Sequence, residues 1–170
     1  MVRKGAAAAP VEAGALISEP LKSGPLISGR RKGRILAFQA LYCWEASGAP
    51  VDQLMGFSWQ DSEKRALSEG AAAFSRLLIA GTVEDIKAID EMIQKHLQNW
   101  DISRLNRVDL AIIRMSVYSL LHQGEIAPSI IIDEAIGIAK EYGTDDSFRF
   151  INGVLDSIRR TIHEDTEDAP

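Results

Sequence analysis

Cysteine and histidine are scarce in this chain of 170 residues, which contains one cysteine, Cys43, and three histidines. A single thiol excludes an intrachain disulfide framework and a dithiol redox motif. His96, His122 and His163 are scattered, without another ligand residue at metal-binding spacing, so we expect no metal site. The glycines at 48, 56, 70 and 81 do not have the spacing of a phosphate-binding loop. We therefore expect no cofactor.

Long apolar runs are also missing. No stretch of about 18 consecutive apolar residues occurs, which argues against a transmembrane helix and a membrane partner. Near the N-terminus, Arg3 and Lys4 precede four alanines, but Pro10 and Glu12 interrupt this stretch too soon for a signal peptide. Together with the single cysteine, these features lead us to expect a cytoplasmic protein.

Groups suited to catalysis are few, and structural roles explain them. Cys43 falls in the interior of a predicted helix, where no helix N-terminus lowers the pKa of its thiol. Asp145 and Asp146 follow Gly143 and Thr144 at a predicted helix start, where carboxylates cap free N–H groups and suit the helix dipole. The sequence therefore predicts no catalytic residues and no enzyme.

Apolar residues recur at three- and four-residue steps along most of the chain, and no stretch alternates as a strand does. This pattern predicts an all-α fold, a bundle of six or seven helices joined by short loops. The first predicted helix covers 31–46, and a short helical turn covers 51–57. From Ser62 onward the pattern predicts either one long helix or two helices joined near Gly81. The last three predicted helices are one capped by Asn106, one over 130–142 that follows an interruption at Gly124 and Pro128, and one that begins at Thr144.

The two ends of the chain differ in composition from the middle. Glycine and proline are concentrated in residues 1–29, which is typical of a disordered tail. The last residues, 163–170, are acidic and are expected to fray. The sequence therefore predicts one helical domain, residues 30–162, between a disordered N-terminal tail and an acidic C-terminal tail.

Positive charge is concentrated at the start of the first predicted helix. Residues 1–34 contain seven Lys or Arg and two Glu, a net charge of +5, whereas the whole chain carries −5 and the remainder −10. Arg30, Arg31, Lys32 and Arg34 supply four of these cations. Because an acidic surface repels phosphate over about 8 Å at physiological salt, an anionic partner should bind close to this cluster.

The spacing of the arginines suits phosphate binding. Arg30, Arg31 and Arg34 lie at i, i+1 and i+4, so their guanidinium groups can share one helix face while apolar neighbours point inward. Tyr42, about two turns further on, offers a ring on which an unstacked base can stack. RNA is favoured over DNA because arginines and aromatic rings suit single strands. The alternative is a solvated helix start, or a strip that pairs with the protein's own acidic residues.

Three segments resemble the NusB family of bacterial transcription antitermination factors. They are Arg30-Arg-Lys-Gly-Arg-Ile-Leu-Ala-Phe-Gln-Ala-Leu-Tyr-Cys-Trp44, Asn99-Trp-Asp-Ile-Ser-Arg-Leu-Asn-Arg-Val-Asp-Leu-Ala-Ile-Ile-Arg114, and the segment from Ile132 that ends in Phe150-Ile-Asn-Gly-Val-Leu-Asp156. The resemblance implies two small helical bundles that bind the boxA segment of nascent RNA jointly with NusE, a ribosomal protein of the small subunit. It also implies that the protein joins RNA polymerase and other Nus factors in the antitermination complex, notably during ribosomal RNA synthesis.

The same resemblance implies two sets of site residues. The RNA-binding set consists of Arg30, Arg31, Lys32, Arg34, Tyr42, Asp146 and Phe150. Asp109 and Glu134 are the candidates for contact with NusE. Structural alternatives remain for several of them: Asp146 and Asp109 as helix-start carboxylates, Glu134 as a surface salt-bridge partner, and Phe150 as a core residue. Arg114, between two apolar residues, is expected to form a structural ion pair.

Two glycines in the matching segments lead to separate expectations. Gly137 interrupts a helix where the family usually has a longer polar side chain. Of the properties that the resemblance implies, this difference most affects the contact with NusE. Gly153 is interpreted as a site of close helix packing.

Two competing hypotheses remain. One keeps the fold but makes the protein a homodimeric protein-interaction scaffold with little RNA binding of its own. The other compares the chain with the NusB-like module of ribosomal RNA cytosine methyltransferases, although this chain has neither a cofactor loop nor a second cysteine.

Overall fold

The computed structural model describes residues 29–59 and 67–167, and every element below belongs to these residues. Their order is α2 (Gly29–Ser47), α3 (Val51–Met55), α4 (Glu69–Glu84), α5 (Ile86–Lys95), the short 3₁₀ helix η2 (Ile102–Arg104), α6 (Arg107–His122), α7 (Pro128–Tyr142) and α8 (Ser147–Glu167). This described part contains helices and no strand, which confirms the predicted all-α class. The predicted tail lies outside it except for Gly29, and so does the predicted helix start at Ser62.

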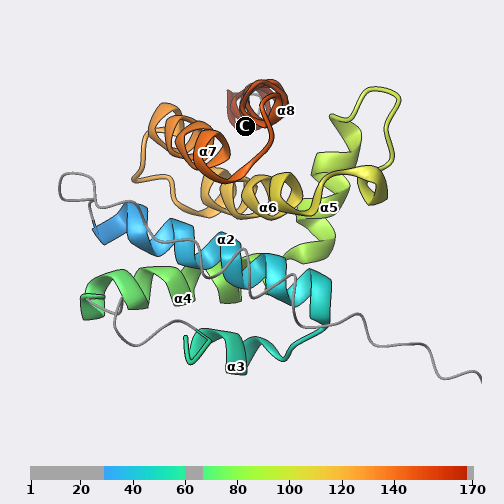
Figure 1. The fold of residues 1–170 in the computed structure, drawn as a ribbon. Coiled ribbons are helices and arrows are strands. Elements are labelled where there is room, and N and C mark those ends of the chain that lie inside the picture. Colours follow the sequence, from blue (N-terminus) through green and yellow to red (C-terminus); the bar gives the residue numbers. More distant parts are fainter. Residues whose placement is uncertain (1–28, 60–66, 168–170) are drawn as a thin grey trace, which may run out of the picture.

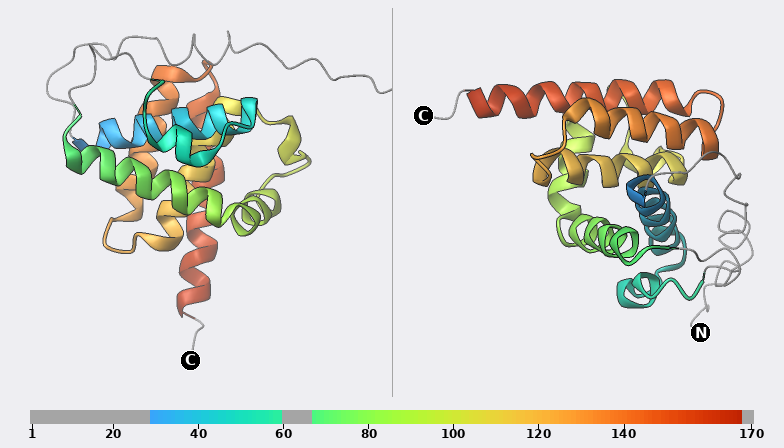
Figure 2. Two further views of the ribbon diagram at one scale, coloured as in Figure 1. Left: turned by 90° about the horizontal axis from the view of Figure 1, so that it is seen from below. Right: turned by 90° about the vertical axis from the view of Figure 1, so that its left-hand side faces the viewer.

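Helix α6 occupies the centre of the fold and contacts helices on both of its sides (Figure 1). On one side, α2 packs against α6, α4 and the short α3. On the other side, α7 and α8 pack against each other and against α6. The right-hand view of Figure 2 shows these layers in order, from α8 and α7 through α6 to α2 and α4. This arrangement agrees with the two small helical bundles that the family resemblance implies.

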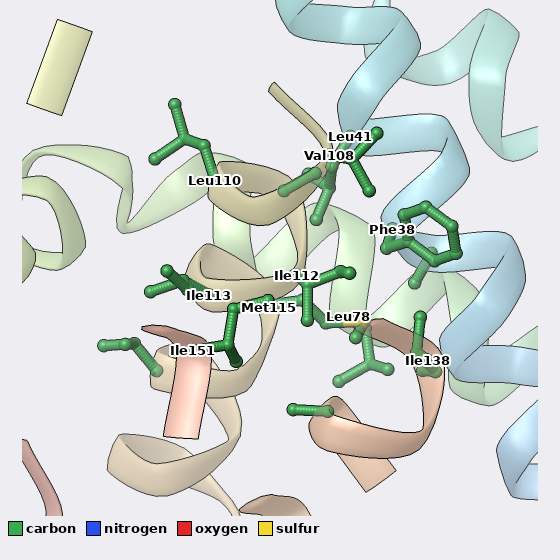
Figure 3. Packing of buried hydrophobic residues seen from close by; sticks show 14 of the residues in the cluster. Phe38, Leu41, Leu78, Val108, Leu110, Ile112, Ile113, Met115, Ile138 and Ile151 are labelled. Atoms are coloured by element: carbon green, nitrogen blue, oxygen red, sulfur yellow. The ribbon is translucent and has the colours of Figure 1, made fainter. Parts of the chain in front are cut away.

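The two bundles share one hydrophobic core around α6. Ile112, Ile113 and Met115 of α6 are at most 2% exposed. In Figure 3 they lie among buried side chains from α2, α4, α7 and α8, namely Phe38, Leu41, Leu78, Ile138 and Ile151. Burying one such side chain contributes about 1.5–3 kcal/mol. This core fixes the relative positions of α2, α7 and α8, which contain most of the candidate site residues.

The predicted start of α6 is confirmed. The side chain of Asn106 accepts a hydrogen bond from the N–H of Val108 at 2.8 Å, which satisfies a donor that the helix itself leaves free. The start of α7 differs from the prediction. Pro128, expected to interrupt the chain, is the first residue of the helix, where its missing N–H costs nothing.

Helix α8 begins later and ends later than predicted. Thr144 to Asp146 form a turn, in which the N–H of Thr144 donates to Oγ of Ser147 at 2.9 Å, and the helix begins at Ser147. The helix continues to Glu167, past the predicted domain boundary at 162, and its residues from His163 onward are exposed. The limits of the folded domain therefore stay a prediction.

Two glycines have roles opposite to those predicted. Helix α4 continues through Gly81 to Glu84, and a Cβ at Gly81 would overlap the ring of Tyr118 on α6. Gly81 thus permits close helix packing, and the break before α5 falls at Asp85 instead. At Gly153, by contrast, a Cβ would have no neighbouring heavy atom within 4 Å, so the prediction of close packing there is wrong.

Candidate nucleic-acid interface

The basic cluster, defined as Arg30, Arg31, Lys32 and Arg34, occupies the first turns of α2. Arg30 is exposed and Lys32 is half-buried, whereas only 5% of Arg34 is exposed. The guanidinium carbons of Arg30 and Arg34 lie 4.8 and 5.3 Å from the centre of the Phe74 ring on α4. Both arginines therefore stack on one aromatic side chain of the neighbouring helix.

Gly33 brings this aromatic ring to the basic cluster. A Cβ at Gly33 would lie 2.9 Å from a ring carbon of Phe74 and 3.0 Å from the carbonyl oxygen of Ala71. A larger residue would push α4 away, so the glycine sets the close approach of α2 and α4. Phe74 was not predicted as part of the site, because nothing in the sequence pairs it with residues 30–34.

Two carboxylates of α7 face Arg31. Its Nη1 lies 3.4 Å from Oε2 of Glu134, and its Nη2 lies 3.3 Å from Oε2 of Glu141. The same oxygen of Glu134 is 3.9 Å from Nη1 of Arg34. The alternative of pairing with the protein's own acidic residues, left open by the sequence, therefore applies to Arg31 and Arg34.

Burial distinguishes Arg34 from the other cations. Desolvation lowers the pKa of Arg34, and the nearby Glu134 carboxylate opposes this by raising it. A buried guanidinium that is held by a carboxylate and an aromatic ring has a structural role at this junction. The three arginines do not form one exposed surface as predicted. Arg34 is buried and Arg31 is paired with Glu134 and Glu141, so the outward charge of the cluster comes mainly from Arg30 and Lys32.

Tyr42 lies on the same helix as the basic cluster but well away from it. It follows Arg31 by eleven residues, about 16 Å along the helix axis and close to three full turns, so both lie on the same side of α2. Its side chain is half-buried and packs against the core. The helix therefore offers a cationic end and, further along the same side, an aromatic ring.

The start of α8 forms a second group of candidate residues. The carboxylate of Asp146 is 90% exposed, and its Oδ1 lies 3.8 Å from Nη1 of Arg149. The backbone N–H of Phe150 donates to the carbonyl of Asp146 at 3.2 Å, so the two residues share the first turn. Phe150 is half-buried and lines two surface cavities, of about 360 and 250 Å³. A half-buried ring that lines a surface cavity can stack on a base.

Asp109 lies inside the protein beside this second group. It is 7% exposed and lines the smaller cavity together with Phe150. Burial raises the pKa of Asp109, and a hydrogen bond from Ser147 at the start of α8 opposes this. Asp109 therefore connects the beginnings of α6 and α8. The two residues predicted to contact NusE lie at different places: Asp109 is buried beside Phe150, and Glu134 is half-buried against the basic cluster.

Sequence reasoning missed one aromatic residue of this surface. Trp100 is 55% exposed, lines both cavities with Phe150, and has the guanidinium carbon of Arg104 at 5.8 Å from its ring centre. Within the segment from Asn99 to Arg114, the sequence gives roles to Asn106, Asp109 and Arg114 and none to Trp100. An exposed tryptophan in a loop with a nearby arginine was the available signal.

The sequence also predicts no catalytic residue, no metal site and no membrane-spanning helix. Cys43 is buried, and burial raises the pKa of its thiol to about 11, so the thiol stays protonated near neutral pH. Among residues 29–59 and 67–167, no group of three or more His, Cys, Asp or Glu side chains is arranged to hold a metal ion. None of the described helices is both long and apolar enough to cross a membrane.

The fold and these side chains define an all-helical protein with a cationic helix end, one exposed aromatic ring at Trp100 and half-buried rings at Tyr42 and Phe150, a class suited to binding a nucleic acid. Comparison with known proteins is more specific. The family model described as NusB family matches residues 31–160. The chain belongs to the NusB family.

Relatives and solved structures support this membership. The chain is 53% identical to the transcription antitermination protein NusB of Treponema denticola over 131 residues, 77% of this chain and 96% of that protein. It is 38% identical to the same protein of Leptospira biflexa over 77% of this chain and 91% of that one. A solved structure of T. maritima NusB matches with a TM-score of 0.71 and 34% identity over 79% and 93% of the two chains. A chain from a crystal structure of antitermination factors NusB and NusE in complex with double-stranded RNA matches with a TM-score of 0.71 and 27% identity over 80% and 99%.

Proposed function

We propose that this protein is a transcription antitermination factor that binds single-stranded boxA RNA together with NusE and joins the RNA polymerase antitermination complex. The observation that supports this most strongly is the 53% identity with an antitermination protein across nearly the whole of that relative. A related chain occurs in a complex of NusB, NusE and RNA. The exposed charge and aromatic rings of this chain provide groups that such a ligand requires.

The RNA contacts divide between phosphates and bases. Arg30 and Lys32 bind phosphate oxygens, because they supply the outward charge of the basic cluster. Tyr42 and Phe150 provide faces for base stacking. The exposed carboxylate of Asp146 accepts hydrogen bonds from exocyclic base amines, which is a contact that depends on sequence.

Arg34 and the two candidate NusE residues act less directly. Arg34 and Asp109 are buried, so they position their neighbours: Arg34 holds the junction of α2 with Phe74, and Asp109 holds the start of α8. Glu134 bridges Arg31 and Arg34. Any contribution of Asp109 and Glu134 to NusE binding therefore comes through the shape and charge of the surface around them.

The mechanism is cooperative binding without a chemical step. This protein supplies part of an RNA-binding surface, and NusE completes it. RNA and NusE therefore each raise the affinity of this protein for the other by the same factor. The protonated thiol of Cys43 and its burial fit a chain whose work is binding. Residues 30–162 form the proposed binding unit.

Fluorescence anisotropy with a short labelled boxA RNA tests this function. The titration compares this protein alone with an equimolar mixture with NusE, and boxA RNA with a scrambled RNA of equal length and composition. We expect selective binding of boxA RNA that NusE strengthens. Equal binding of both RNAs, or no binding with NusE present, would exclude the proposed function. Light scattering on the same samples would then show whether the chain is a homodimeric scaffold.

A further inference from the structure

We propose that Glu141 lowers the RNA affinity of the interface by holding the Arg31 guanidinium in an ion pair that an RNA phosphate has to displace. This inference rests on the proposed function, because the phosphate belongs to the RNA. It concerns a part of the site that the comparisons leave unassigned, the contact between the basic cluster and α7.

The contact engages the part of Arg31 that a phosphate would use. Its two terminal nitrogens, Nη1 and Nη2, face Glu134 and Glu141 at 3.4 and 3.3 Å. Arginine binds phosphate through the same nitrogens, in a two-pronged arrangement. A carboxylate on each nitrogen therefore competes directly with phosphate oxygens, and its negative charge repels the RNA backbone as well.

Gly137 makes this arrangement possible. A Cβ at this position would lie 2.9 Å from Nη1 and 3.4 Å from Nη2 of Arg31. The guanidinium therefore lies directly over the backbone of α7, between two carboxylates that precede and follow Gly137 by three and four residues on the same helix face. We call Glu134, Gly137 and Glu141 the Arg31 clasp.

The two carboxylates of the clasp differ in what they hold. Glu134 also lies 3.9 Å from Arg34, whose side chain is 6% exposed, so removing Glu134 would leave a buried cation without this carboxylate. The ion pair of Glu141 is with Arg31, and both side chains are about one-quarter exposed. Pairs with such access to water are weak. Glu141 is therefore the residue that phosphate can displace, and its substitution tests the clasp with little effect on the fold.

Glu141→Gln is the test variant, because it removes the charge and keeps the shape. Glu164→Gln is the matched control: it makes the same charge change on the exposed end of α8, which projects away from the other helices in Figure 2. Both are titrated with labelled oligouridylate at low salt, and with boxA RNA plus NusE, at several salt concentrations. Circular dichroism confirms that each variant is folded.

We expect Glu141→Gln to tighten binding of both RNAs about two- to fivefold, the range that corresponds to an exposed ion pair. The log–log dependence of affinity on salt should steepen by up to about 0.7, because Arg31 then neutralises a further phosphate. Glu164→Gln should have a smaller effect. In an Arg31→Ala background, Glu141→Gln should bind RNA no more tightly than Glu164→Gln does, because Arg31 and Glu141 act through one contact.

Weaker binding by Glu141→Gln would overturn the proposal, since the carboxylate would then position Arg31 for RNA. An undiminished gain in the Arg31→Ala background would also overturn it, because the effect would be one of overall charge. The predicted changes on oligouridylate, without selective binding of boxA RNA, would support the clasp and reject the proposed function. Failure of every variant to bind either RNA would reject both.

Discussion

Arg114 of α6 forms a two-pronged ion pair with Asp90 of α5. Its Nε and Nη2 donate to Oδ1 and Oδ2 of Asp90, each at 2.8 Å. Its Nη1 donates to Glu45 near the end of α2, also at 2.8 Å. Arg114 is 7% exposed, so this network links three helices across the protein. This network confirms the predicted structural ion pair, and it connects the three helices without any contact to RNA.

Arg114→Ala should lower the free energy of unfolding by about 1–3 kcal/mol, because it removes three charged hydrogen bonds to Asp90 and Glu45 and the packing of a buried side chain. Arg114→Lys keeps the charge but loses the two-pronged geometry, so we expect a smaller loss. Urea denaturation measures both changes. A loss below about 1 kcal/mol for the alanine variant would show that the network behaves like an exposed salt bridge.

Asp109→Asn should raise the free energy of unfolding at pH 7. Burial raises the pKa of Asp109 in the folded protein, despite the hydrogen bond from Ser147. The folded state therefore favours the protonated carboxyl. The stability that this preference contributes is fully present below the unfolded pKa of about 3.9, and it is lost as pH rises through the folded pKa. Urea denaturation across this pH range should show that the difference in free energy of unfolding between Asp109→Asn and the unmodified protein becomes smaller as the pH falls. A loss of stability that is the same at every pH would contradict this.

The two glycines with reversed roles provide a matched pair of variants. Gly81→Ala should destabilise the protein by about 1–3 kcal/mol, because its Cβ would overlap the ring of Tyr118. Gly153→Ala should stabilise it by up to about 1 kcal/mol, because alanine favours the helix and meets open space. Thermal denaturation distinguishes the two. Stabilisation of both variants would show that helix propensity, and not the neighbouring helix, determines the outcome.

Phe150→Leu should weaken boxA RNA binding by about 1–3 kcal/mol without changing its salt dependence, because it removes a stacking surface and no charge. Leucine fills much of the same apolar space, so the fold should persist. Phe150→Ala extends the test. If the alanine variant unfolds while the leucine variant binds RNA normally, Phe150 is a core residue and the stacking role is wrong.

Arg30→Ala combined with Lys32→Ala should weaken RNA binding and flatten its log–log salt dependence by up to about 1.4, since each phosphate that is no longer neutralised accounts for about 0.7. The control is Lys87→Ala with Lys95→Ala, which removes two exposed charges from α5. Anisotropy titrations at several salt concentrations compare the two. An equal effect of both double variants would show that only net charge matters.

Arg34→Ala should mainly lower stability, by about 1–3 kcal/mol, because it leaves Glu134 and the Phe74 ring without this partner. Urea denaturation measures this loss. The contrary result is a stable variant with a large loss of RNA affinity, which would place Arg34 in direct contact with phosphate.

The helices were predictable wherever the signal is local. The cap at Asn106 and the end of α7 before Gly143 depend on residues within one turn, and the structure agrees. Gly81 and Gly153 were misinterpreted because the role of a helical glycine depends on which neighbouring helix faces it. Pro128 was misassigned because proline both ends and begins helices, and only the following residues distinguish the two.

The candidate site was predictable in composition but not in arrangement. Arg30, Arg31, Lys32 and Arg34 are adjacent in sequence, yet their partners come from α4 and α7. Glu134 and Glu141 follow Arg31 by 103 and 110 residues, so no local pattern indicates the pairing. The burial of Arg34 likewise depends on the approach of α4 at Gly33.

Transcription through a terminator with purified RNA polymerase and Nus factors, this protein serving as the only NusB-type component, tests the central claim most directly. We predict that adding the protein increases read-through on a template with an intact boxA, and that a scrambled boxA or omission of NusE abolishes the increase. Unchanged read-through on the boxA template, with every other factor present, would contradict the account.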